Sequence, residues 1–283
     1  MAQRGRRPWR QSAQEYARGI VGGLFFSMPL LFTMEVWWAG FVLPPGRLLA
    51  GVCATLLLLI GYNRYAGLRR DARVLDTVIE SVEELGLGIV VAAGSLWLLG
   101  RITLAMPIDE IIGKIVTEAV VVAIGVSIGT AELGAGSAAE QGMADERPPR
   151  EQPWRALLDQ LALASCGAVL VAANVAPTEE IPLLASEATP GRLLGMIALS
   201  IMLAMVVLFF SDFLGAKPAS DVGWPHVLRW TAITYAAALL ASAALLGFFG
   251  RFEQVGVGMI IGQTVVLGSV ATLGASAGRM LLQ

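Results

Sequence analysis

The chain has 283 residues, of which 56% are hydrophobic and only 15% charged, and its formal net charge is −2. Soluble domains usually carry about a quarter charged residues, so this composition excludes an ordinary soluble protein. The near-neutral charge, without a long basic patch, excludes a nucleic-acid partner. The apolar residues form blocks close to the roughly 20 residues that cross a bilayer, which predicts the lipid bilayer as the partner.

Eight membrane spans are predicted in chain order, and the predicted class is an all-α integral membrane protein. The first block is too long for a signal peptide, and no small-residue cleavage site follows it, so we expect a retained helix. Cys53 and Cys166 lie inside apolar blocks without CxxC spacing, which indicates neither a disulfide framework nor a zinc site. The predicted spans are 17–42, 47–62, 76–99, 110–133, 157–176, 191–213, 226–249 and 255–282.

The basic residues predict the orientation. Of the 20 Lys and Arg residues, 15 fall on one side of the predicted spans and 5 on the other. Short loops rich in Lys and Arg stay in the cytoplasm. We therefore predict that both termini are cytoplasmic, which agrees with an even number of spans.

The sequence also repeats itself. Residues 110–132 align without gaps on residues 259–281, and three shorter motifs recur in the same order. The sequence therefore predicts two tandem four-helix repeats, 1–133 and 153–283, joined by a flexible cytoplasmic linker, 134–152. Units of four spans insert with the same orientation, so a pseudo-twofold axis along the membrane normal should relate them. The recurring motifs are Pro8-Trp9-Arg10 with Pro153-Trp154-Arg155, Pro45–Leu49 with Pro190–Leu194, and Gly100-Arg101 with Gly250-Arg251.

Glycines four residues apart recur in the last span of each repeat, as Gly125 and Gly129 and as Gly274 and Gly278. Small residues at this spacing let membrane helices approach closely. The matched pairs predict that these two spans cross near the axis.

Glu35 and its aligned residue Glu180 are the candidates for an outer cation site. Each follows a threonine by two residues, Thr33 and Thr178, and Glu179 adjoins the second carboxylate. Carboxylates and hydroxyls are hard oxygen ligands that suit a cation such as calcium. The alternative is that the carboxylates lie at water level and pair with Arg47 and Arg192.

Four acidic residues begin the third span: Asp76, Glu80, Glu83 and Glu84. At 100° per residue they fall within an arc of about 100°, one helical stripe. The aligned segment 229–249 has no carboxylate, which favours a stripe facing a water-filled path or a cation site. The alternative is a solvated helix extension that ends before the membrane begins at Leu85.

Glu118 lies inside the fourth span, and Lys114, four residues earlier, can form an ion pair with it along the helix. Its aligned residue is Leu267, so the acid is present in one half only. Asp212, near the end of the sixth span, is a weaker pathway candidate and is also explained as an interfacial residue. Ionisable groups within spans are costly and mark functional sites.

Catalytic motifs are missing from the sequence. His226 is its single histidine, which excludes histidine-rich metal sites and Ser-His-Asp triads, and no nucleotide-binding fingerprint is present. We expect no enzyme and no cofactor beyond a bound cation.

Two segments carry a family resemblance, Tyr16–Leu24 and Pro29–Trp38, most specifically at Thr33-Met34-Glu35. They resemble a family of uncharacterised bacterial integral membrane proteins with a domain of unknown function. The resemblance covers most of the chain and implies a bacterial inner-membrane location, but no activity.

Together these features favour a bacterial inner-membrane cation channel or transporter that uses intramembrane and outer-mouth carboxylates. The transported cation is divalent or the transport is proton-coupled. The sequence is also compatible with a homo-oligomer. The alternative is a non-transporting membrane scaffold or assembly factor whose acids pair internally. A lipid-modifying enzyme would need a nucleophile–base pair that the sequence lacks.

Overall fold

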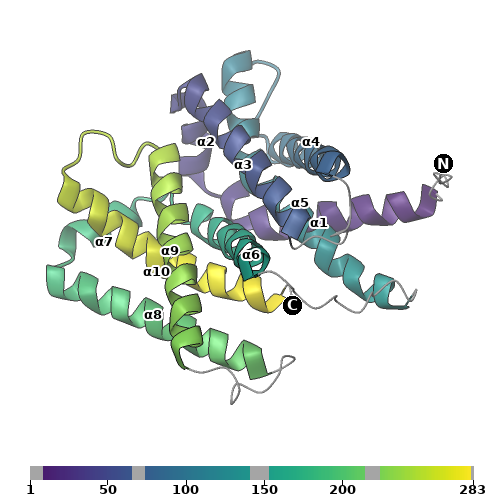
Figure 1. Cartoon of the computed structure of the whole chain (residues 1–283). Helices are drawn as coiled ribbons and strands as arrows, with labels where there is room; N and C mark the ends of the chain where they lie inside the picture. The colour runs from purple at the N-terminus through teal and green to yellow at the C-terminus, as the bar shows by residue number, and fades with distance from the viewer. Residues whose placement is uncertain (1–8, 66–73, 141–152, 214–223, 282–283) are drawn as a thin grey trace.

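A computed structural model describes residues 9–65, 74–140, 153–213 and 224–281. These residues form ten α-helices and no strand (Figure 1), which confirms the predicted all-α class for this part of the chain. The helices are α1 Trp9–Leu31, α2 Met34–Val42, α3 Pro45–Tyr65, α4 Val74–Leu98, α5 Ile108–Glu140, α6 Pro153–Ala173, α7 Glu180–Glu187, α8 Pro190–Phe213, α9 Trp224–Phe248 and α10 Val257–Leu281.

Six of these helices are long and apolar enough to cross a membrane: α3, α4, α5, α8, α9 and α10. Helices α1 and α2 add a seventh crossing if they count together as one broken span. In α6 the apolar segment, Gln160–Ala173, is shorter than a full crossing. The described residues therefore include several membrane-length helices, but not eight continuous ones.

The predicted span 17–42 is wrong as a single helix. Helix α1 ends at Leu31, α2 begins at Met34, and the two are bent by 89°. Pro29 lies in the last turn of α1, where its missing N–H removes one i→i−4 hydrogen bond and so weakens the helix next to the break. The Thr33 hydroxyl donates to the Pro29 carbonyl oxygen at 2.7 Å and so satisfies one of the exposed acceptors of the helix end.

The predicted span 157–176 also ends early. Helix α6 stops at Ala173, and hydrogen-bonded turns lead through Pro177 to α7. A proline restricts the residue before it to extended conformations, which explains why the helix cannot run on to 180. Each half thus contains a long helix, a break and a short helix. In the first half a single span was predicted there, whereas α7 lies beyond the end of the predicted span 157–176.

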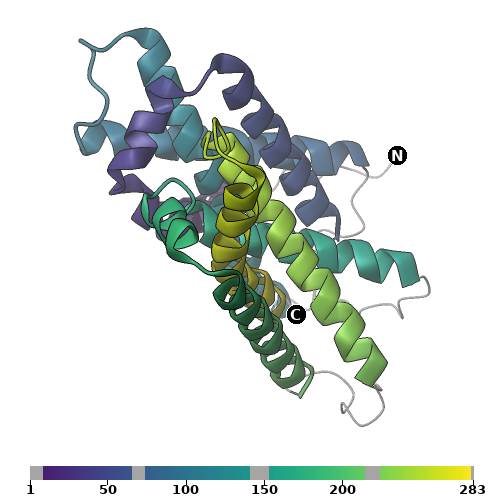
Figure 2. The same cartoon turned by 90° about the vertical axis from the view of Figure 1, so that its left-hand side faces the viewer.

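Helix α5 is the most enclosed helix of the first half. Of its apolar span, 78% is buried, compared with 11% for α8. Helices α1 to α4 pack against α5, and α6 to α9 pack against α10. The two halves meet mainly where α6 contacts α3 and α5, near the centre of the molecule in Figures 1 and 2.

Glycines allow two antiparallel helix pairs to touch backbone to backbone. A Cβ atom on Gly22 of α1 would lie 2.5 Å from the Gly125 carbonyl oxygen and 2.5 Å from the Gly129 Cα atom of α5. Gly167 of α6 meets Gly274 and Gly278 of α10 in the same way. The prediction that these glycines bring α5 and α10 together is therefore wrong, because they serve contacts with α1 and α6.

Two further pairs of positions have the same local structure. Gly100 and Gly250 adopt positive φ values of 67° and 76° after α4 and α9. In both cases the following arginine N–H, of Arg101 or Arg251, donates back to a helix carbonyl at 2.8 Å. Glycine favours this conformation because it has no Cβ atom.

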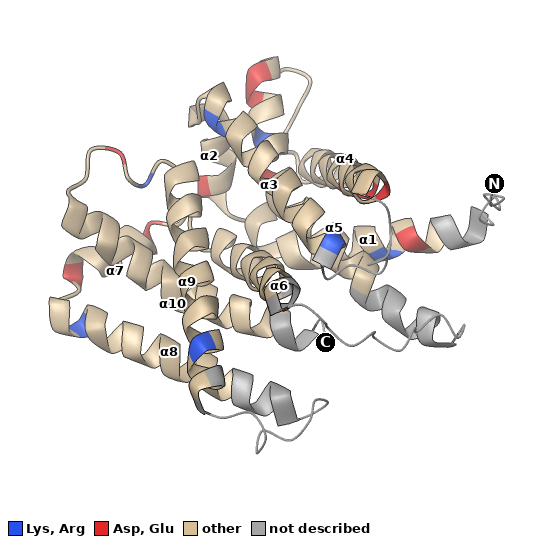
Figure 3. Ribbon diagram, viewed as in Figure 1, with Lys and Arg blue, Asp and Glu red and all other residues tan. Residues whose placement is uncertain are grey.

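Large apolar side chains face outward along the helices, for example Phe25, Leu98 and Leu240, which are 71%, 79% and 73% exposed. The Lys, Arg, Asp and Glu residues in view lie mainly towards helix ends and loops (Figure 3). An apolar surface with charges at its ends is the pattern of a lipid-facing bundle.

Candidate functional site: two buried carboxylates

The acidic stripe of α4 divides into buried and open positions. Thr77, Ser81 and Glu84 lie on the buried face, at the i, i+4, i+7 spacing of one helix side. Asp76 and Glu80 are half-buried, and Glu83 is exposed. The predicted stripe is therefore one buried carboxylate, Glu84, with three neighbours graded towards the surface.

Glu84 belongs to a buried polar cluster that joins three helices. Asn63 of α3 donates from Nδ2 to a Glu84 carboxylate oxygen at 2.7 Å and to Ser81 Oγ at 3.1 Å. Ser127 of α5 donates to Asn63 Oδ1 at 3.1 Å, and Ser81 donates to the Thr77 carbonyl oxygen at 2.9 Å. The cluster supplies hydrogen bonds to Glu84 but no ion pair from the described Lys and Arg residues.

Glu118 of α5 is a different kind of site. Its side chain is 0% exposed, and neither carboxylate oxygen has a hydrogen-bond partner among the described residues. Leaving a buried polar atom unpaired costs about 1–3 kcal/mol, and more if the group is charged. A structural role does not explain such a residue, because an apolar side chain would fill the same place without this cost.

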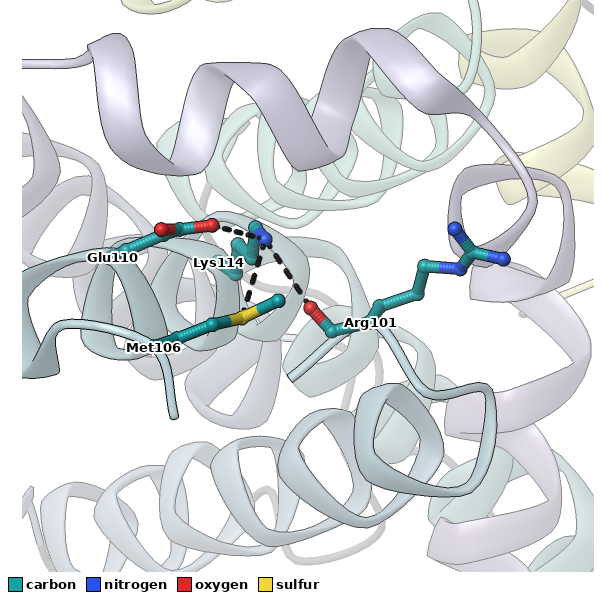
Figure 4. Close-up of polar contacts among 4 residues, drawn as sticks. All are labelled: Arg101, Met106, Glu110 and Lys114. Carbon is teal, nitrogen blue, oxygen red and sulfur yellow. Dashed lines mark hydrogen bonds and ion pairs between the residues drawn. The ribbon is translucent and has the colours of Figure 1, made fainter. Parts of the chain in front are cut away.

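The predicted ion pair between Glu118 and Lys114 is wrong. Lys114 turns in the opposite direction along α5, and its Nζ lies 2.5 Å from Glu110 Oε1 (Figure 4). The same ammonium group contacts the Arg101 carbonyl oxygen at 3.2 Å and Met106 Sδ at 3.7 Å. A lysine in a helix can reach a carboxylate at i−4 or at i+4. Here the Arg101 carbonyl oxygen and Met106 Sδ, from the loop before α5, favour the position next to Glu110.

A second unpaired polar group lies on α1. Ser27 is 0% exposed, and its Oγ has no partner in the described structure. The contacts of Gly19 with Thr130 and of Gly23 with Val122 show that α1 runs antiparallel to α5. Continuing that register by one turn places Ser27 at the level of residues 118–122.

The outer-site candidates lie on separate short helices. Glu35 is half-buried in the first turn of α2, which packs against α5, whereas Glu180 is exposed in the first turn of α7, which packs against α10 (Figure 1). In the described part of the chain, no group of three or more acidic, Cys or His side chains could hold a metal ion. A shared outer cation site stays a prediction.

Arginines in the loops after α4 and α9 contact the segments that carry the outer-site candidates. Arg251 pairs with Glu179 at 2.8 Å and also donates to the Pro177 carbonyl oxygen, while the Arg101 guanidinium lies 4.2 Å from the Trp37 ring centre. Neither arginine proposed as an alternative partner contacts Glu35 or Glu180. Arg47 instead pairs with Glu253 at 2.5 Å, and Arg192 donates to the Glu187 carbonyl oxygen at 3.4 Å.

Thr33 and Thr178 form hydrogen bonds at the two helix breaks, between α1 and α2 and between α6 and α7. Thr33 bonds the end of α1, as described above, and the Thr178 hydroxyl lies 2.9 Å from the Val175 carbonyl oxygen. Hydrogen bonding from the same Thr178 hydroxyl, and then from the Glu180 backbone N–H, lowers the pKa of the exposed Glu180 carboxyl from its usual value. Glu180 is therefore ionised at neutral pH. Asp212 lies in the last turn of α8, and its side chain falls outside the described residues.

Comparison with known proteins gives one family. Residues 15–282 match the family described as "Putative integral membrane protein (DUF2391)". The chain belongs to this family. The match confirms the resemblance seen in the sequence and identifies an integral membrane protein. Searches of curated proteins and of solved structures give no match.

Sequence reasoning missed the partners of Glu84 in this membrane protein. Asn63, Ser81 and Ser127 come from three different helices, and no local motif links them. The one available signal was the spacing of Thr77, Ser81 and Glu84, which puts three polar side chains on one face of an apolar helix.

Asn63→Ala is expected to lower the free energy of unfolding by about 1–3 kcal/mol, because it leaves the buried Glu84 carboxylate without its amide donor. Thermal unfolding of the purified protein in detergent measures this change. Glu83→Ala, at an exposed neighbouring position, is the control and should change stability by less than about 0.5 kcal/mol. Equal effects of the two substitutions would mean that the cluster contributes nothing to stability.

Proposed function

We propose that the protein is a cation channel or transporter of the bacterial inner membrane. The supporting observation is that two carboxylates, Glu84 and Glu118, are buried within the membrane-length helices α4 and α5. Insertion scales give a cost of about 2.5–3.5 kcal/mol for a charged residue at the centre of a membrane helix. Groups that costly persist where they bind or pass an ion.

The difference between the halves supports a specialised role. Leu267 stands in α10 at the position aligned with Glu118, and it is fully buried. Thr234 stands in α9 at the position aligned with Glu84. The same fold is thus compatible with uncharged residues at both positions, so the carboxylates of the first half are not needed to form it.

We also propose that the halves are tandem repeats in the same orientation, with both termini cytoplasmic. The glycines that touch between α6 and α10 align with those that touch between α1 and α5. Pro45 and Pro190 both begin a helix, and Gly100 and Gly250 both end one with positive φ. Counting each broken pair, α1 with α2 and α6 with α7, as one crossing gives eight spans.

At the outer mouth, Glu35 and Glu180 with Thr33, Thr178 and Glu179 are proposed to attract cations before they enter. Their support is electrostatic, since Glu180 is exposed and its pKa is lowered, and carboxylate rings concentrate cations at channel mouths. Asp76, Glu80 and Glu83 would serve the same role at the other end of the path, next to Glu84, with Asp212 as a further candidate.

Transport is tested with purified protein in liposomes and a panel of Na⁺, K⁺, Ca²⁺ and H⁺ gradients. The intact protein is expected to dissipate at least one gradient, and Glu84→Gln with Glu118→Gln is expected to reduce that flux by at least tenfold. Gln keeps the size of the side chain but removes the charge. The exposed Glu187→Gln, at the end of α7 and outside the proposed path, is the matched control and should retain at least half of the flux.

The same experiment addresses the alternative of a scaffold or assembly factor. A scaffold would move none of the four cations, and its double variant would behave as the intact protein does. Absence of flux for every cation in folded, reconstituted protein would reject the proposed function.

A further inference from the structure

We infer that Glu118 is a proton-binding site and that a proton, not a metal ion, neutralises its carboxyl group. The inference rests on the proposed function, because it names the cation that the first half handles at this position. It follows from the absence of metal ligands and of a cationic partner at the Glu118 carboxyl, and from the spacing of the ionisable residues along α5.

A metal ion needs more ligands than this site supplies. Calcium takes 6–8 oxygen ligands, and magnesium takes six. The Glu118 oxygens have no polar partner within hydrogen-bond distance in the described structure. The nearest hydroxyl along the chain, that of Thr117, donates to the Gly113 carbonyl oxygen at 2.8 Å. The Ser27 hydroxyl, from α1, is itself unpaired and so lies beyond bonding distance of Glu118.

Among the described residues, no Lys or Arg side chain pairs with Glu118 either. The three N–H donors of Lys114 face three acceptors, which are Glu110 Oε1, the Arg101 carbonyl oxygen and Met106 Sδ. Other ionisable side chains lie on the helices that pack against α5, but none of them is a hydrogen-bond partner of Glu118. They include Arg18 on α1, Glu35 on α2, Arg47, Tyr62 and Arg64 on α3, Asp76, Glu80, Glu83 and Glu84 on α4, and Cys166 on α6.

A buried carboxylate without a cation or hydrogen-bond donors is strongly disfavoured relative to the neutral acid. The O–H form needs no counter-ion and is compatible with the apolar side chains of Val121 and Val122 in the next turn, both buried. Protonation therefore explains why the unpaired group is tolerated where it lies.

Glu110, Lys114 and Glu118 form a graded row along one side of α5. They stand at i, i+4 and i+8, and their exposed fractions fall from 25% for the Glu110 side chain to 8% for Lys114 and 0% for Glu118. Rows of ionisable residues that lead inward are the usual form of proton relays in membrane proteins. The row gives Glu118 a route to solvent at the start of α5.

The row also provides a counter-ion for the ionised state. When the O–H bond of Glu118 breaks, the proton passes to a water molecule, and the electron pair stays on the carboxylate. The Lys114 ammonium group can turn from Glu110 to Glu118, because both lie four residues away. The contact between Lys114 and Glu110 thus corresponds to protonated Glu118, and the contact between Lys114 and Glu118 to the ionised state.

Infrared difference spectroscopy of the intact protein in lipid tests the inference without any transport measurement. A pH step to alkaline conditions is expected to remove the C=O stretching band of a protonated carboxylic acid. Glu118→Gln should lack this band, whereas Glu83→Gln should keep it. Glu118→Leu provides a second variant in which an amide band cannot be confused with the acid.

Two results would overturn the inference: an identical acid band in the intact protein and in both Glu118 variants, or loss of the band when saturating Na⁺ or Ca²⁺ is added at constant pH. Persistence of the band under those ions supports a proton site. Because the spectra need no flux, a protein with a titrating Glu118 and no transport would reject the proposed function alone.

Discussion

Gly22→Leu is expected to prevent α1 from packing on α5 and to lower the free energy of unfolding by at least about 3 kcal/mol. Any side chain at Gly22 meets backbone atoms of Gly125 and Gly129 at 2.5 Å. Backbone atoms in two packed helices cannot move aside as a flexible side chain can, so the cost should reach or exceed the upper end of the range for overpacking. The measurement is thermal unfolding, with the monodisperse fraction in size-exclusion chromatography as a second readout.

Gly61→Leu is the matched control, because nothing lies within 4 Å of the position that its Cβ atom would occupy on α3. It should leave stability unchanged or slightly raise it, since leucine favours helix more than glycine does. Gly167→Leu, in the corresponding contact of α6 with α10, should be as damaging as Gly22→Leu. A stable Gly22→Leu protein would show that α1 does not approach α5 in this way.

Glu118→Leu is expected to have opposite effects on stability and on function. Stability should rise by about 1–3 kcal/mol, because the substitution removes a buried polar group without partners. Transport should be lost, because leucine cannot bind a proton or a cation. Residues that lower stability in order to serve function show this trade-off. Thermal unfolding and liposome flux of the same preparation measure the two effects.

Glu84→Leu provides the comparison, because Glu84 accepts a hydrogen bond from Asn63 at 2.7 Å. Its replacement removes the acceptor of one N–H of the buried Asn63 amide, so stability should fall instead of rise. If Glu118→Leu were destabilising by the same amount as Glu84→Leu, the Glu118 carboxyl would have partners that contribute to folding.

Much of the fold follows from the sequence, because lipid imposes a simple length rule on helices. The starts of α3 and α8 follow from Pro45 and Pro190, and the ends of α4 and α9 from Gly100 and Gly250. The break after Leu31 was missed, since Phe32 continues an apolar run that hydropathy alone reads as one span, and the end of α6 at Ala173 was placed three residues too late, at 176. Only Pro29 and Pro177 indicated them.

The candidate site was predicted less well than the fold. Glu84 and Glu118 were singled out in the sequence as ionisable residues within predicted spans, and the structure buries both, but the sequence did not predict their surroundings. Spacing along α5 offers Lys114 two carboxylates, Glu110 and Glu118, and the choice is made by Arg101 and Met106 in the preceding loop. Contacts with a preceding loop therefore decide which of the two carboxylates pairs with Lys114. Such contacts cannot be read from the spacing of residues in a single sequence.

The bend between α1 and α2 has a consequence for the surrounding lipid. Between Arg18 and the end of α1 at Leu31 the helix carries no charge, which gives it an apolar length of about 20 Å at 1.5 Å per residue. The hydrocarbon core of a typical bilayer is roughly 30 Å thick, and the 89° turn means that α2 adds little depth. Phe25 and Met28 on this helix face outward. We therefore expect the bilayer beside α1 to thin, so that short-chain lipids gather along this edge and the protein favours thinner membranes.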